Sequence, residues 1–211
     1  MRQGAHLELP TRKSREGSEL SGNDVMEILL ASGAVLKGHF LLTSGQHSDM
    51  YVEKFRLLER PDLAEPVLRR LADRFRDAGV EVVLGPAVGG IIVAYEMARQ
   101  LGARAIFAER QWGHLTLRRG FQLRPGERCL VVEDIVTTGG SVREALAVAR
   151  RHGAHIVGVA VLADRSGGQA LDFGVPVEYL VSLNVPHWEP TECPLCRAGV
   201  PLEHRGSRDI T

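Results

Sequence analysis

The chain has 211 residues, of which 44% are hydrophobic and 25% charged, so it is long enough for one ordinary domain and too apolar for a mostly disordered protein. Lys and Arg together number 26, as do Asp and Glu, and the formal net charge is zero. A neutral chain has no overall positive field to hold nucleic acid or an acidic membrane, so we expect neither as a partner.

The sequence also predicts the cellular compartment. Its longest apolar runs are shorter than the roughly 18 residues that a membrane span requires, and residues 1–20 contain no apolar core of a secretory signal. Three cysteines do not form the pattern of a secreted disulfide framework. We therefore expect a cytoplasmic protein.

Two helices are predicted in the first part of the chain. A capping residue at Ser21 or just after it begins a run of apolar positions at helical spacing that stops at Gly33. Pro61, at a first-turn position, begins a second such run, which continues to Gly79.

Strands and helices then alternate along the chain. The predicted strands are 81–86, 105–110, 128–134, 156–164 and 177–183, and the predicted helices are 91–102 and 141–153. The apolar runs do not alternate strictly with polar residues, which is typical of strands buried on both faces. We expect an α/β fold, a central and mostly parallel sheet with helices on both faces.

No repeat or linker divides the alternating region. We therefore expect a single domain of residues 20–211, preceded by a flexible polar tail of residues 1–19. Residues 110–125 fit neither period cleanly: LTLRRGFQL alternates enough to be a hairpin, whereas RQWGHL is expected to be a mobile loop. Long loops between core strands are often functional.

The most informative stretch is CLVVEDIVTTGGS, residues 129–141. A buried strand leads into two adjacent acids, Glu133 and Asp134, then into a turn of small residues and a helix with its expected N-cap at Ser141. In a doubly wound sheet this edge binds ligands. Glycines let the backbone approach an anion and the loop amides favour it, so we expect a phosphate site.

The two acids are unsuited to phosphate because like charges repel. They suit the hydroxyl groups of a sugar that carries the phosphate, or a Mg²⁺ bound to those hydroxyls. A phosphoribosyl group is therefore the expected ligand. A strand ending in solvated acids before a plain turn explains any one of these features but not the ordered set.

Several segments together resemble one enzyme family. VVEDIVTTGGS resembles the ribose-phosphate signature of the type I phosphoribosyltransferases, and residues 85–102 resemble the Gly-rich turn of their diphosphate-binding loop. Residues 38–53 resemble the N-terminal segment that partly covers the base pocket in members that use orotate. ADR, residues 163–165, matches an Asp-Arg pair whose arginine meets the orotate carboxylate. The resemblance spans about residues 20–185.

The resemblance implies a small hood built by the N-terminal segment over the sheet, a Mg²⁺ cofactor held mainly through the substrate with a possible contact from Asp134, and a homodimer. The implied reaction transfers ribose 5-phosphate from phosphoribosyl diphosphate to orotate in pyrimidine synthesis. The implied catalytic residues are Asp134, Glu133, Arg110 and His114. The implied phosphoribosyl diphosphate site comprises Gly89, Gly90, Arg110, Glu133, Asp134, Ile135, Val136, Thr137, Thr138, Gly139, Gly140 and Ser141. The implied orotate site comprises Thr137, Arg165, Ser44 and Gly45.

Three positions depart from the family pattern. Thr43 and Gly89 stand where the family often has lysines, and Glu109-Arg110 stands where it has an Arg-Lys pair. Arginine can replace lysine at a diphosphate, although its charge is a planar fork rather than a point. A phosphoribosyltransferase for a purine or other base, and a non-catalytic sensor of phosphoribosyl diphosphate, therefore remain as alternatives.

A C-x-x-C pair, Cys193 and Cys196, lies near the C-terminus. With His187 or His204 it would make a zinc site, but a single pair has no second pair at convincing spacing. We expect a plain turn with two thiols and less than one zinc per chain. No partner in the sequence is apparent for His39 or His47.

Overall fold

The computed structural model describes residues 21–42, 44–167 and 172–204. The predicted tail of residues 1–19 and the Thr43 position lie outside this part of the chain. The helices are α1 (Gly22–Ala31), α2 (Phe55–Leu58), α3 (Pro61–Asp73), the 3-10 turn η1 (Arg76–Ala78), α4 (Gly89–Leu101), α5 (Gly140–Arg151) and α6 (Pro194–Arg197). The strands are β1 (Val35–Leu41), β2 (His47–Val52), β3 (Val82–Pro86), β4 (Arg104–Gln111), β5 (His114–Leu117), β6 (Arg128–Val136), β7 (His155–Asp164), β8 (Val177–Ser182) and β9 (Glu203–His204).

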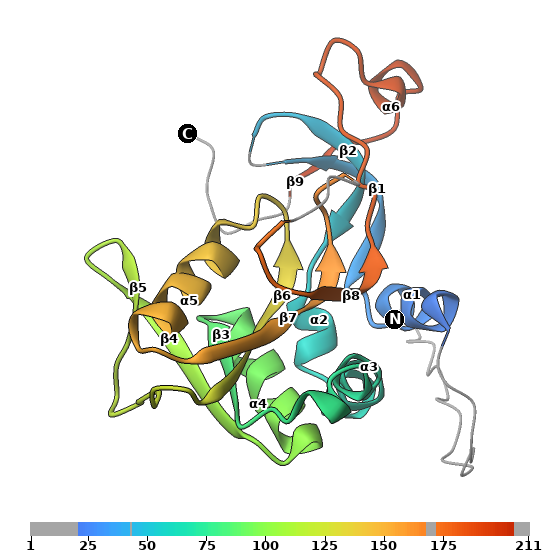
Figure 1. Ribbon diagram of the computed structural model, residues 1–211. Helices are drawn as coiled ribbons and strands as arrows, with labels where there is room; N and C mark the ends of the chain where they lie inside the picture. Colours follow the sequence, from blue (N-terminus) through green and yellow to red (C-terminus); the bar gives the residue numbers. More distant parts are fainter. Residues whose placement is uncertain (1–20, 43, 168–171, 205–211) are drawn as a thin grey trace, which may run out of the picture.

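The larger sheet has the order β5-β4-β3-β6-β7-β8 and is parallel except for β5. Its central strands β3, β6 and β7 are buried on both faces, which explains their long apolar runs. Along β6, for example, Leu130 packs into the apolar cluster under α3 and α4, and its neighbour Val131 packs into the cluster under α5. Figure 1 shows α5 on one side of the sheet and α3 and α4 on the other. The predicted α/β fold is confirmed.

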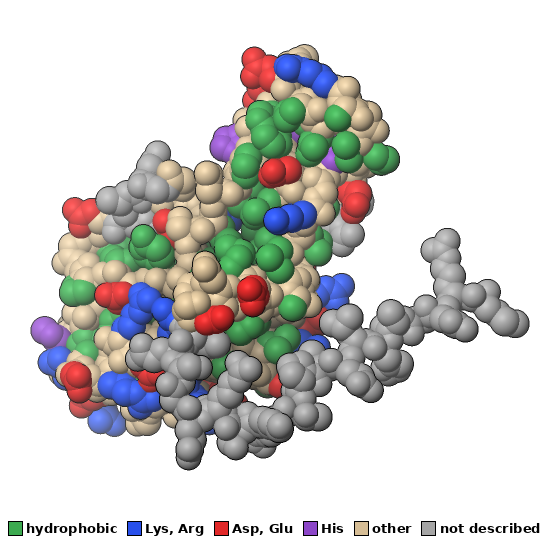
Figure 2. Space-filling view, turned by 90° about the vertical axis from the view of Figure 1, so that its right-hand side faces the viewer, with side chains coloured by type: hydrophobic (Ala, Val, Ile, Leu, Met, Phe, Trp, Pro, Cys, Tyr) green, Lys and Arg blue, Asp and Glu red, His purple; other side chains and the backbone are tan. Residues whose placement is uncertain are grey.

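A second, smaller sheet forms a hood above the larger one. Its order is β2-β1-β9, with β1 and β2 antiparallel and β9 parallel to β1. The hood therefore contains residues from both ends of the chain, whereas the sequence predicted a contribution from the N-terminal segment alone. Figure 2 shows it as a narrower lobe that stands above the body of the molecule.

The structure corrects the prediction for residues 110–125. RQWGHL is not a loop: β4 and β5 form an antiparallel hairpin in which Gln111 pairs with His114 across a two-residue turn. Trp112 and Gly113 both have positive φ, at 49° and 86°, as a tight turn that matches the twist of a hairpin requires. None of the helices in the described part of the chain is long and apolar enough to cross a membrane.

Candidate active site

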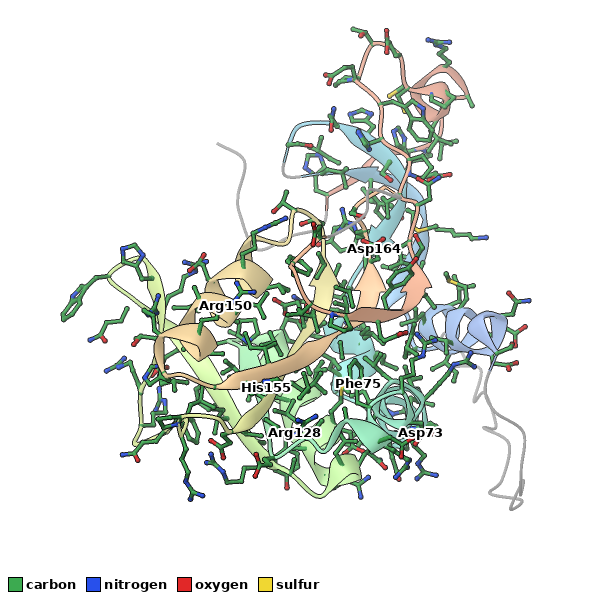
Figure 3. All side chains as sticks on the ribbon, in the orientation of Figure 1. Asp73, Phe75, Arg128, Arg150, His155 and Asp164 are labelled. Carbon is green, nitrogen blue, oxygen red and sulfur yellow. The ribbon has the colours of Figure 1, made fainter. Side chains whose placement is uncertain are left out.

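The candidate site lies where the strand order of the larger sheet reverses. β3 is followed through α4 by β4 on one side, while β6, β7 and β8 continue on the other. The loops after β3 and β6 therefore diverge and leave a crevice at the carboxyl ends of the strands, the usual ligand site of such sheets. In Figure 3, Asp164 and His155 mark opposite ends of β7, with Asp164 on the side of the hood. The crevice thus faces the hood.

The acid pair predicted from the sequence lies near the end of β6. Glu133 and Asp134 are 7% and 1% exposed, and the backbone amide of Asp134 donates to Glu133 Oε1. Burial, and after it the charge of Asp134, raises the pKa of Glu133 to about 8. A buried carboxyl group with such a pKa changes its charge readily when a cation or a hydroxyl group binds beside it.

Lys54 supplies a cation that the sequence analysis did not assign to the site. Its ammonium group donates to Asp134 Oδ1 at 2.9 Å and lies 2.8 Å from Oδ2. Lys54 directly follows the segment 38–53 that resembles the family's N-terminal motif, and it is one of three lysines in the chain. Its place directly after that segment is the feature of the sequence that could have indicated a role in the site.

Gly89, at the start of α4, closes the crevice from the other side. A Cβ atom at this position would lie 1.5 Å from Asp134 Oδ2, so a side chain does not fit. This close approach explains why a residue without a side chain stands at position 89. Gly90 is buried and packs against Pro86, so it shapes the turn rather than lining the crevice.

The loop after β6 lines a cavity together with the start of α5. Its lining residues are Arg110, Glu133, Ile135, Val136, Thr137, Thr138, Gly139, Gly140, Ser141, Val142 and Glu144. The helix is capped at Gly139, in the left-handed conformation with φ 75°, and no side chain caps it. Ser141 is therefore inside the first turn rather than at the predicted N-cap. The uncapped amides at this helix N-terminus favour an anion such as phosphate.

Three arginines in or next to the β4–β5 hairpin are held by acids in this structure, and one of them is the predicted Arg110. Arg110 lines the cavity but donates two hydrogen bonds to Glu144, at 3.0 and 2.8 Å, which lower the pKa of that carboxyl group. Arg118 and Arg119 pair with Glu109. His114 begins β5, is exposed and does not line the cavity.

Arg165 follows β7 at the same edge of the sheet as the acids. Its backbone amide donates to the carbonyl of Val136, at the end of β6. The side chain is half-buried, and this loss of hydration lowers its pKa. Within the described ranges, no acid lies at ion-pair distance from it. A half-buried guanidinium group without an acid partner is suited to an anionic ligand.

Ser44 and Gly45 lie in the turn between β1 and β2. Gly45 has φ 86° and donates to the carbonyl of Leu42, and the Ser44 hydroxyl contacts Gln46. This turn belongs to the hood and does not line the cavity beside α5. The structure therefore brings Glu133, the loop and Arg110 together around one cavity. Asp134 lies beside them in the ion pair with Lys54, and Ser44 and Gly45 lie apart.

A comparison with known protein families matches residues 56–191 to the phosphoribosyl transferase domain. The chain is 50% identical over 191 residues to an orotate phosphoribosyltransferase of Pelotomaculum thermopropionicum, which covers 90% of this chain and all of that protein. It is 49% identical over 186 residues to the orotate phosphoribosyltransferase of Thermotoga maritima, covering 88% of this chain and 99% of that one.

Solved structures agree in fold. Orotate phosphoribosyltransferase from Aeropyrum pernix superposes with a TM-score of 0.62 at 28% identity, covering 75% of this chain and 93% of that one. An adenine phosphoribosyltransferase from Rhodothermus marinus has a TM-score of 0.57 at 21% identity over 75% of this chain and 99% of its own. The second likeness concerns the fold alone.

Proposed function

The chain belongs to the phosphoribosyltransferase family, and on that premise we propose that it transfers ribose 5-phosphate from phosphoribosyl diphosphate to orotate. The products are orotidine 5′-phosphate and diphosphate, and the step serves pyrimidine synthesis. The observation that carries the proposal is the buried acid pair, which directly precedes an uncapped helix N-terminus in the crevice. Two acids for the ribose hydroxyls beside a loop for its phosphate form a site for a phosphorylated sugar.

In the reaction the bond from the sugar C1 to the diphosphate oxygen breaks, and a bond from C1 to a ring nitrogen of orotate forms. Positive charge develops on the ribose ring, as in glycoside hydrolysis. Glu133 and Asp134 hold the ribose hydroxyls, and the negative charge of Asp134 favours that transition state. The amides and hydroxyls of residues 137–141 fix the 5′-phosphate, so the sugar cannot shift as the bond breaks.

Departure of diphosphate requires cations on the other side of the sugar. Arg110 reaches the cavity, and we propose that it exchanges Glu144 for the leaving diphosphate when the substrate binds. His114, on the other strand of the same hairpin, joins it when the hairpin moves toward the substrate. Gly89 and Gly90 keep the β3–α4 turn close to the same region. Closure of these segments would exclude water, which would otherwise hydrolyse the activated sugar.

The donor set fits the Mg²⁺ that the family implies. Asp134 Oδ2 is buried and accepts no hydrogen bond, and carboxylate oxygen is the ligand type that Mg²⁺ prefers. Lys54 already lies beside that oxygen, so Asp134 would contribute at most one ligand and substrate oxygens the others. When bound, Mg²⁺ would supply positive charge that stabilises the leaving diphosphate.

Orotate carries a carboxylate, and Arg165 is the residue that we propose to hold it. Thr137 at the loop and Ser44 and Gly45 in the hood complete the proposed base site, which requires the hood turn to close toward the crevice. Arginine holds a carboxylate through two parallel hydrogen bonds. An orotate site built in this way rejects uracil, which would leave the guanidinium group unpaired.

The experiment that tests the function is diphosphate release from phosphoribosyl diphosphate and Mg²⁺ with orotate, uracil, adenine or hypoxanthine in separate reactions. Release with orotate alone supports the proposal. Release of diphosphate only with a purine base would show that the substrate is that base and not orotate. Tight binding of phosphoribosyl diphosphate by calorimetry without turnover of any base would identify a sensor instead.

We further propose a cytoplasmic homodimer. The three cysteines are free thiols, as is usual in a reducing compartment. Val88, Ile92 and Tyr95 are exposed apolar side chains one turn apart along α4, and Phe55 on the adjoining α2 is exposed as well. A second copy would bury this surface. Tyr95→Glu should convert the dimer to a monomer in sedimentation velocity, whereas Tyr179→Glu, on an exposed residue of β8, should not.

A further inference from the structure

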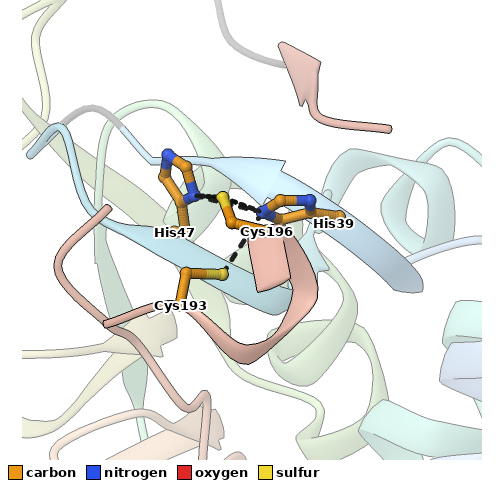
Figure 4. Close-up of side chains that lie close together, drawn as sticks. All are labelled: His39, His47, Cys193 and Cys196. Carbon is orange, nitrogen blue, oxygen red and sulfur yellow. Dashed lines mark hydrogen bonds between the residues drawn. The ribbon is translucent and has the colours of Figure 1, made fainter. Parts of the chain in front are cut away.

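Four side chains of metal-binding type converge in the hood. They are His39 on β1, His47 on β2, Cys193 just before α6 and Cys196 within it (Figure 4). One ligand atom from each residue lies within 4.8 Å of all the others. The sequence offered His187 and His204 as partners for the two cysteines. The structure instead pairs the cysteines with two histidines more than 140 positions away.

Four of the six distances between these atoms are close to those of a tetrahedral metal site. His39 Nε2 lies 3.1 Å from His47 Nδ1 and 3.4 Å from the sulfur of Cys193. The sulfur of Cys196 lies 3.8 Å from His39 Nε2 and 3.2 Å from His47 Nδ1. Metal–nitrogen bonds of about 2.0 Å and metal–sulfur bonds of about 2.3 Å place tetrahedral ligands about 3.3–3.8 Å apart. A single ion at the centre therefore needs only small movements.

A second contact orients one of the histidines toward this centre. His39 Nδ1 lies 2.8 Å from the carbonyl oxygen of Val200, so the proton of its neutral ring belongs on Nδ1, which donates to that oxygen. Nε2 is then unprotonated and presents its lone pair to the other three ligands. A backbone carbonyl that fixes the tautomer in this way is the usual outer partner of a metal-bound histidine.

The location of the cluster gives it a structural role. His39, His47 and Cys193 are buried, although few apolar side chains are buried in the hood. Phe40 and Cys193 are buried apolar residues that belong to neither of the two core clusters of the larger sheet. Small units without a sufficient core are commonly held together by a metal. Here the cluster joins the C-terminal segment to the β1–β2 hairpin.

We propose that His39, His47, Cys193 and Cys196 bind one Zn²⁺. The ion would join the segment around α6 to the β1–β2 hairpin of the hood. Two thiolates and two imidazoles in tetrahedral arrangement select zinc among the common metals. Four protein ligands leave no open position, so the ion is structural and takes no part in group transfer. Binding releases the two thiol protons to solvent. The inference rests on the geometry of the hood and is independent of the reaction proposed above.

The test uses the full chain, purified without an affinity tag and without chelators, and measures metal by mass spectrometry. We expect about one zinc per chain. Cys196→Ser and His47→Gln should each lose most of it. Cys129→Ala, which removes the remaining thiol, and His187→Gln should retain the full amount. Because Cys196 is exposed, its substitution should leave the fold of the larger sheet intact.

Two further measurements separate a metal centre from a chance cluster. Reconstitution with Co²⁺ should give the visible bands of a tetrahedral site and a near-ultraviolet sulfur-to-cobalt band, and the latter should weaken in Cys196→Ser. A chelator should lower the Tm of the wild-type protein but not that of Cys196→Ser. Protein that binds no zinc after exposure to excess zinc would overturn the proposal. So would a Cys193–Cys196 disulfide in freshly purified protein, or stoichiometric iron in place of zinc.

Discussion

Lys54 and Asp134 are 80 positions apart in the sequence and form an ion pair in which the ammonium nitrogen lies 2.8–2.9 Å from both carboxylate oxygens. The Asp134 side chain is 1% exposed, whereas 34% of the Lys54 side chain is accessible. A buried carboxylate is costly without a partner, so this pair ties the segment after the hood hairpin to the end of β6 in the crevice. Any movement of the hood toward the crevice would therefore change the distance between Lys54 and Asp134.

Removal of Lys54 should therefore affect both stability and substrate binding. Lys54→Met leaves Asp134 buried without its cation, and we expect a loss of about 1–3 kcal/mol in the free energy of unfolding. The Michaelis constant for phosphoribosyl diphosphate should rise at the same time. Urea unfolding and steady-state kinetics measure the two effects. Lys37→Met, on an exposed lysine of β1, is the control, and equal effects of the two substitutions would contradict the assignment.

The acid pair should matter to turnover more than to the fold. Asp134→Asn and Glu133→Gln keep the shape of each side chain but remove the carboxyl groups proposed to hold and stabilise the ribose. We expect each to reduce kcat by about 10-fold to 100-fold or more. Glu178→Gln, on a β8 carboxylate that pairs with Arg74 at the surface, should leave kcat unchanged. Wild-type kcat in both acid variants would refute the proposed site.

The raised pKa of Glu133 predicts a particular pH dependence of stability. The folded state holds its proton up to a pKa of about 8, above the ordinary value of 4.5. Glu133 therefore lowers stability progressively as the pH rises from the unfolded pKa to about 8, with no further loss above it. Glu133→Gln removes this titration, so its stability relative to wild type should grow by about 1–3 kcal/mol between pH 6 and pH 9. Urea unfolding at both pH values measures it, and a constant difference would disprove the assignment.

The close approach of Gly89 to Asp134 predicts the effect of one methyl group. The Cβ of Gly89→Ala would lie 1.5 Å from Asp134 Oδ2 and 3.4 Å from Lys54 Nζ, so the turn or the ion pair must shift. We expect activity to fall by about 10-fold or more, because displacements near 1 Å in an active site have costs of this order. Gly22→Ala, where nothing lies within 4 Å of the new atom, should retain wild-type kinetics.

The core of the fold was predictable because its signals are local. β6 and β7 contain the apolar runs 129–132 and 156–163, and the structure places both strands within two residues of the predicted ranges. Burial on both faces makes such a run continuous, so it is easy to recognise in the sequence. The acid pair and its loop were predictable for a related reason. Strand end, phosphate loop and helix start are consecutive in the sequence, so one segment contains most of the site.

The features that the sequence did not predict depend on distant contacts or on unusual turn residues. Cys193 and His39 are 154 positions apart, and no periodicity relates a C-terminal turn to a hood strand. The pairing of Lys54 with Asp134 depends on folding in the same way. The β4–β5 hairpin was missed because Trp112 occupies a positive-φ turn position where Asn or Gly is the usual signal.

Arg165 carries the prediction on substrate choice. The side chain is half-buried and makes no ion pair with an acid among the described residues. Its neighbour Asp164 accepts a hydrogen bond from the amide of Ser166. Orotate would supply the missing anion. We expect Arg165→Ala to raise the Michaelis constant for orotate by about 10-fold to 100-fold, the range expected for loss of a charge-assisted pair. The Michaelis constant for phosphoribosyl diphosphate should change little, because the loop after β6 is proposed to bind the phosphate.

Arg74→Ala, at a surface ion pair with Glu178, is the matched control for Arg165→Ala. Equal rises in both constants would place Arg165 at the phosphoribosyl group, and unchanged use of orotate would remove it from the site.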